Sequence, residues 1–121
     1  MHDPDLADRM EDMEPQFWAL LQDVVTSFPK WDILRFFVEL GIESAPLDEI
    51  AEAVGREPAA LLGEAADLVR GGMLGRRTVD GMTHYVITQE SRRRAQLEAF
   101  LTATRDRDFR LKVIYHLLHR D

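Results

Sequence analysis

The chain has 121 residues, of which 45% are hydrophobic and 31% charged, a formal net charge of −7 and no cysteine. This composition predicts one folded domain, and the lack of cysteine excludes disulfides, thiolate metal sites and cysteine nucleophiles. No apolar run approaches the ~18 residues of a membrane span and the acidic start is unlike a secretory signal, so we expect a cytoplasmic protein.

The sequence of the first part of the chain predicts a tail followed by two helices. Residues 1–13 are expected to form a flexible acidic tail, and 14–121 a single domain. Pro15 favours the start of an N-terminal helix that Pro29 should end. Its apolar face is expected to consist of Phe17, Leu20, Leu21, Val24, Val25 and Phe28. A second helix, apolar on most of its circumference, should follow and run to Gly41.

Residues 44–47 are expected to form an extended link, followed by a short helix that ends at Gly55. Pro58 should open the next helix, which the glycines at 71 and 72 should end. Two strands are then expected, over 73–79 and 82–88. The Asp-Gly pair between them is the strongest short signal for a tight hairpin turn.

Two further helices are expected after the hairpin. Thr88 should cap the first, which would run to about Thr104 with Ala95, Ala99 and either Leu101 or Ala103 on its inner face. Asp108 should cap the second. Its apolar stripe is expected to consist of Leu111, Ile114 and Leu118.

This order of elements predicts a mainly α fold with a two-stranded β-hairpin wing. The core is a winged helix-turn-helix over 30–88, flanked by an N-terminal helix (14–29) and C-terminal helices (89–121). The fold-determining segments are Trp31–Phe37, Pro46–Gly55, Leu68–Leu74, Asp80-Gly81 and Tyr85–Thr88. Together they resemble the superfamily of bacterial and archaeal winged-helix regulators that includes the arsenic-repressor and multiple-antibiotic-resistance-repressor groups. The resemblance implies a DNA-binding transcriptional regulator that acts as a homodimer.

In such regulators the second helix of the motif enters the DNA major groove. Here the exposed face of that helix is expected to carry Glu57, Ala59, Ala60, Leu62, Gly63, Glu64, Ala66 and Asp67. It lacks the Ser, Thr, Gln, Arg or His donors that read base edges, which is a departure from the family pattern. The run is also similar to winged-helix dimerisation domains found ahead of small-molecule methyltransferase domains, where the scaffold binds protein. A second hypothesis is therefore a protein-interaction adaptor that docks through Leu62, Gly63, Glu64 and Asp67.

Basic residues are concentrated late in the chain: residues 15–67 carry a net charge of −7 and residues 68–121 a net charge of +5. If the chain binds DNA, we expect the wing and the neighbouring arginines to make the contacts. These candidates are Arg56, Arg76, Arg77, His84, Arg92, Arg93 and Arg94. The alternative is a solvated basic face without a nucleic-acid partner.

Catalysis and cofactor binding are not expected. No nucleophile–base pair, phosphate-binding loop or paired-carboxylate spacing is present. His116 and His119 are three residues apart on an expected helix, but a transition-metal site needs three or four convergent ligands, so no metal is expected.

The flanking helices are more apolar than one small domain needs, which favours a twofold dimer. The expected interface residues are Phe17, Trp18, Leu21, Phe36, Leu111, Ile114 and Leu118.

Overall fold

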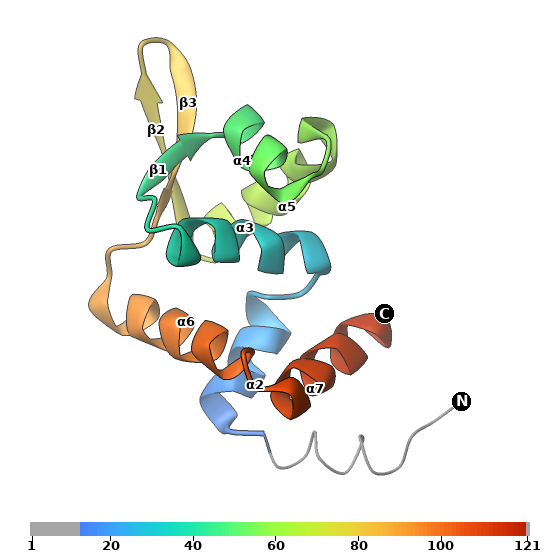
Figure 1. Cartoon of the computed structure of the whole chain (residues 1–121). Helices are drawn as coiled ribbons and strands as arrows, with labels where there is room; N and C mark the ends of the chain where they lie inside the picture. Colours follow the sequence, from blue (N-terminus) through green and yellow to red (C-terminus); the bar gives the residue numbers. More distant parts are fainter. Residues whose placement is uncertain (1–12, 121) are drawn as a thin grey trace.

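The computed structural model describes residues 13–120, and within this range the chain forms six helices and a three-stranded antiparallel sheet (Figure 1). The elements are α2 (Pro15–Asp23), α3 (Phe28–Glu39), β1 (Ser44–Pro46), α4 (Leu47–Val54), α5 (Pro58–Arg70), β2 (Leu74–Val79), β3 (Met82–Ile87), α6 (Ser91–Ala103) and α7 (Arg107–Leu118). The predicted mainly α fold with a β-hairpin after the helices is confirmed, in a winged-helix-like arrangement.

The helix α3 lies in the middle of the molecule. Figure 1 shows α4, α5 and the hairpin on one side of it, and α2, α6 and α7 on the other. Ile33, Leu34 and Phe37 on α3 are fully buried between these two groups. Within the described range no helix is long and apolar enough to cross a membrane.

The boundary between the first two helices differs from the prediction. α2 ends at Asp23, and Ser27 begins α3 because its hydroxyl accepts a hydrogen bond from the Lys30 backbone N–H at 3.3 Å. Pro29 therefore lies in the first turn of α3, where its missing N–H costs nothing, and it does not end the preceding helix. The predicted tail over 1–13 lies outside the described residues except for Met13, which is buried against the core.

The link predicted over 44–47 contains a strand, β1, which pairs with β3 so that Ala45 lies opposite Tyr85. The hairpin itself is as predicted. Asp80 and Gly81 both have positive φ, at 51° and 78°, which a two-residue turn of this type requires. Its register places Val79 opposite Met82.

The two helices of the motif begin and end where the sequence predicts. Gly55 ends α4 in the left-handed conformation, with φ of 73°, and Pro58 occupies the first turn of α5. Leu61, Ala65 and Leu68 form the buried side of α5. Because these side chains are buried, the opposite side of α5 faces solvent.

The inner face predicted for α6 is wrong except at Leu101. Glu90, not Thr88, caps α6, and Leu97, Phe100 and Leu101 form its buried face, while Ala95 and Ala99 are exposed. Larger apolar side chains gain more from burial than alanine does, so they determine how the helix is rotated.

α7 is capped by Asp106 rather than Asp108, and it buries Val113 and Leu117. In the predicted stripe, Leu111 and Leu118 are exposed, whereas Ile114 is half-buried and packs partly against the core.

Candidate interaction face on the helix-turn-helix

The solvent-exposed side of α5 carries apolar residues, most of them small. Ala59, Ala60 and Gly63 are exposed, and Leu62 projects from among them with 56% of its surface accessible. A Cβ atom built on Gly63 would meet nothing within 4 Å. None of the described residues therefore packs against this glycine. The face is therefore open to another molecule, but it offers hardly any hydrogen-bond donors.

Two carboxylates of α5 are held by the start of α3. The Lys30 ammonium lies 3.0 Å from Asp67 Oδ2 and 3.9 Å from Glu64 Oε2, and it donates to Thr26 Oγ1 at 2.6 Å. The Ser27 hydroxyl donates to Glu64, and Arg70 pairs with Asp67. Glu64 and Asp67, predicted as docking residues, are thus engaged within the chain and anchor α5 to α3.

α4 packs against α5, and the exposed carboxylates of α4 and of the residue before α5 are called the acidic rim. Asp48 and Glu49 in the first turn of α4, together with Glu52 and Glu57, are exposed. Arg56, the cation between the two helices, donates to Asp32 Oδ2 at 3.0 Å and so is already neutralised. The helix-turn-helix surface consequently presents negative charge where a DNA-reading motif would meet phosphates.

The wing divides its basic residues between two faces. Arg76 lies opposite Tyr85 and Arg77 opposite His84, and neighbouring residues of a strand point to opposite sides. The Arg76 guanidinium lies 5.8 Å from the Tyr85 ring centroid, whereas Arg77 donates to Ser44 Oγ at 3.1 Å. Within residues 13–120, neither arginine forms an ion pair with a carboxylate.

The three arginines at the start of α6 lie away from the wing tip, at the base of the hairpin (Figure 1). Arg93 donates to the Gly71 carbonyl at 2.7 Å, and Arg94 pairs with Glu98 at 2.7 Å. Glu90 accepts the backbone N–H groups of Arg93 and Arg92, and these hydrogen bonds lower the pKa of its carboxyl. Arg93 therefore fastens α6 to the C-terminal end of α5, and Arg94 is paired within α6.

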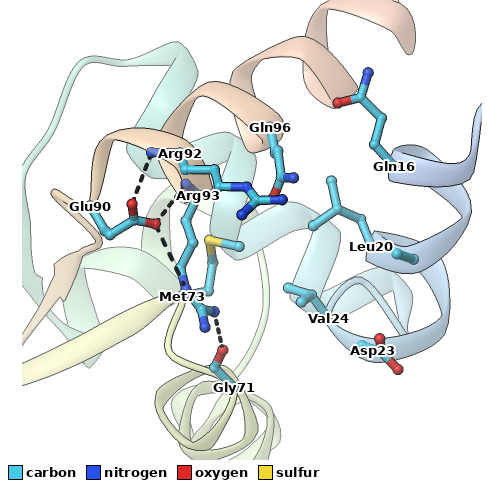
Figure 2. Close-up of a pocket in the computed structure, with 11 residues that line it drawn as sticks. Gln16, Leu20, Asp23, Val24, Gly71, Met73, Glu90, Arg92, Arg93 and Gln96 are labelled. Atoms are coloured by element: carbon cyan, nitrogen blue, oxygen red, sulfur yellow. Dashed lines mark hydrogen bonds and ion pairs between the residues drawn. The ribbon is translucent and has the colours of Figure 1, made fainter.

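Arg92 lines the largest cleft described, of about 610 Å³, between α2, α6 and the base of the wing. Figure 2 shows Arg92 extending along one wall toward Gln96, with Leu20 and Val24 on the opposite wall. Asp23 and Gln16 extend that opposite wall. The cleft is open and mixed in polarity, and within the described range it contains no paired groups suited to catalysis.

The dimer candidates fall into two groups. Phe17, Leu21 and Phe36 are buried inside the single chain, so they stabilise its own core. Trp18, Leu111 and Leu118 are exposed, and Ile114 is half-buried. Trp18 lies edge-on to His116 with ring centroids 5.1 Å apart. Burial, with a smaller contribution from Arg120, lowers the pKa of His116.

The sequence-based reasoning missed Lys30. It is the only lysine of a largely apolar helix, and its two carboxylate partners follow 34 and 37 residues later. The acidic residues around Asp48 can be read from the sequence. That their helix, α4, packs beside α5 is seen only in the folded structure.

Among the described residues no group of three His, Asp or Glu side chains is placed to hold a metal ion. Comparison with family models, curated proteins and solved structures finds no match to this chain. A function must therefore follow from the geometry of the chain itself.

Proposed function

We propose that this chain is a winged-helix protein-interaction module, and that the exposed side of α5 docks a partner protein instead of reading DNA bases. One observation supports this most: Ala59, Ala60, Leu62 and Gly63 form an apolar, donor-poor surface with carboxylates around it. Sequence-specific DNA recognition needs hydrogen-bond donors and acceptors on base edges, together with cations on phosphates.

The surface also indicates the chemistry of the partner. The side chain of Leu62 can enter an apolar pocket, and Gly63 lets a partner backbone or side chain approach closely. Asp48, Glu49, Glu52 and Glu57 at the rim favour a partner with lysines or arginines around that pocket, since complementary charge accelerates and orients association.

DNA binding is the second candidate function, and the observation in its favour is confined to the wing. Arg76 and Arg77 are exposed and form no ion pair with a carboxylate in the described part of the chain. Such a regulator would contact mainly the phosphate backbone, with few base contacts by α5.

We also propose that two copies of the chain associate through α7. Leu111 and Leu118 are exposed on this helix, and the half-buried Ile114 lies between them in the sequence. Sedimentation should give a dimer for the wild type and a monomer for the Leu111→Glu/Leu118→Glu variant. Leu40→Glu is the control, because Leu40 is as exposed as Leu118 but lies at the end of α3. A monomeric wild type would contradict this proposal.

The first experiment separates the two functions with random-sequence duplex DNA in a mobility-shift assay. The adaptor predicts no binding of the wild type at about 50 mM salt. Binding that weakens steeply with salt and is lost in Arg76→Ala/Arg77→Ala would establish the wing as a DNA-binding element and contradict the adaptor.

The second experiment places a photo-crosslinking amino acid at position 62 in the native cell. Position 40 is the matched control, since Leu40 and Leu62 are both exposed leucines. The adaptor predicts one partner that crosslinks from position 62 and not from position 40, and whose yield falls in a Gly63→Gln background. Equal crosslinking from both positions, or insensitivity to Gly63→Gln, would contradict docking on α5.

A further inference from the structure

A small cavity of about 150 Å³ lies between α3 and the turn that joins α6 to α7. Its lining residues come from segments before and after α5 in the sequence, and none of them belongs to the exposed α5 face. The residues that line it are Trp31, Arg35, Glu39, Thr104, Arg105 and Arg110. Three guanidinium groups and one carboxylate therefore surround a space of molecular size, which gives the lining a net positive charge.

The three arginines are held differently. Arg35 pairs with Glu39 on the same helix at 3.4 Å, which accounts for the only carboxylate in the lining. Arg110 Nη1 donates to the carbonyls of Thr104 and Arg105, at 3.2 and 3.3 Å, so its guanidinium is fixed beside the turn. The Arg105 side chain makes no hydrogen bond or ion pair with any residue in the range 13–120.

Trp31 forms part of the wall of the cavity. This side chain is only 7% exposed, and its Nε1–H is buried without a hydrogen-bond partner among the described residues. Other atoms of the ring therefore line the cavity. A ligand held by the arginines would change the surroundings of this indole without accepting a hydrogen bond from it.

We propose that the cavity binds a phosphate-sized oxyanion, which lies beside the Trp31 ring and accepts hydrogen bonds from the Arg105 and Arg110 guanidinium groups. The volume of about 150 Å³ leaves room for a phosphate group. Guanidinium groups match the oxygens of a phosphate in geometry as well as charge. A bound oxyanion would join α3 to the α6–α7 turn and relieve repulsion among the arginines.

The sequence provides a direct reporter for this site. The chain has two tryptophans, so its indole N–H region in an NMR spectrum contains two signals. Inorganic phosphate is titrated into the isotope-labelled full chain, with chloride adjusted to keep the ionic strength constant. The Trp31 signal should move in a saturable way, with a midpoint on the order of 1 mM, while the Trp18 signal stays in place.

Two arginine variants form the matched test. Arg105→Gln should weaken phosphate binding severalfold without unfolding the chain, since the Arg105 side chain makes no contact of its own. Arg107→Gln is the control, because Arg107 is exposed on the same segment but does not line the cavity. Sulfate should compete with phosphate for the site.

The source of the oxyanion is tested with glycerol phosphate. A Trp31 shift with inorganic phosphate alone identifies a free ion, and an equal shift with the monoester identifies the phosphate group of a larger molecule. Three results would overturn the proposal: no Trp31 shift up to about 50 mM phosphate, equal movement of both indole signals, or unchanged binding in Arg105→Gln.

Discussion

The contacts of Lys30 with α5 predict that the substitution Lys30→Met destabilises the fold. Methionine keeps the apolar stem of the side chain and removes the ammonium group. The side chain of Lys30 is only 11% exposed, whereas those of its partners Glu64 and Asp67 are 28% and 40% exposed. The substitution therefore leaves two carboxylates of α5 without their shared cation.

The size of the effect follows from burial. Coulomb's law with an effective dielectric constant of about 20 gives about 5–6 kcal/mol for unit charges 3.0 Å apart, and desolvation offsets most of it. Removing one partner of a fully buried pair costs about 3–5 kcal/mol, and of an exposed pair about 0–1 kcal/mol. Because water reaches both carboxylates, we expect a loss of about 1.5–2.5 kcal/mol. For a domain of this size, that corresponds to a melting temperature lower by about 6–10 °C.

Urea unfolding followed by circular dichroism measures this loss, and a double-mutant cycle with Asp67→Asn isolates the pair. Arg94→Met is the control, because Arg94 and Glu98 form a more exposed pair within one helix and should contribute less than about 0.5 kcal/mol. A Lys30→Met loss below about 0.5 kcal/mol, with no coupling to Asp67, would refute the reasoning. Asp67→Asn should also leave crosslinking from position 62 unchanged, since Asp67 serves the fold.

Two further predictions concern backbone conformation and pH. Gly63→Ala should raise the free energy of unfolding by about 0.5–1 kcal/mol, because the added Cβ meets open space within a regular helix. Gly81→Ala should lower it by about 1–2 kcal/mol, because φ is 78° at that position; equal effects in urea unfolding would contradict the turn geometry. The lowered pKa of His116 means that the folded state takes up its proton less readily than the unfolded state. Its favourable contribution is therefore present above pH 6.5 and is lost as the pH falls through the folded-state pKa. Between about pH 7.5 and 5, the wild type should lose more thermal stability than His116→Gln, and parallel curves would contradict this.

Local signals in the sequence were sufficient for most of the fold. The Asp80-Gly81 turn, the stop at Gly55 and the start at Pro58 each depend on the backbone preference of one or two residues. Such preferences act whatever the rest of the chain does. They placed the helix-turn-helix and the hairpin correctly before any tertiary contact was known.

The errors occurred where tertiary packing decides. In α6 the small residues Ala95 and Ala99 and the larger Leu97 and Phe100 form competing stripes, and the larger side chains are the ones buried. The strand β1 has three residues and exists only because β3 offers an edge for Ala45 to pair with. Neither result follows from local periodicity.

The candidate site was harder to predict, because its charges are matched over long distances in the sequence. Arg56 pairs with Asp32, 24 residues earlier, and Arg93 donates a hydrogen bond to the Gly71 carbonyl, 22 residues earlier. From the sequence alone, these arginines would be counted as free to contact phosphates. In the folded chain they are engaged, so they contribute less to a nucleic-acid surface than their number implies.

The uneven distribution of charge along the chain has a structural explanation in these contacts. The acidic residues of α4 and the start of α5 remain on the surface, whereas Arg93 and Arg94 are directed to the C-terminal end of α5 and to α6. A major-groove reader needs the reverse arrangement, with cations near the start of its second helix. In this chain Arg93 and Arg94 are engaged by α5 and α6, and the carboxylates of α4 remain exposed. The electrostatics of the helix-turn-helix therefore favour a basic protein partner over DNA.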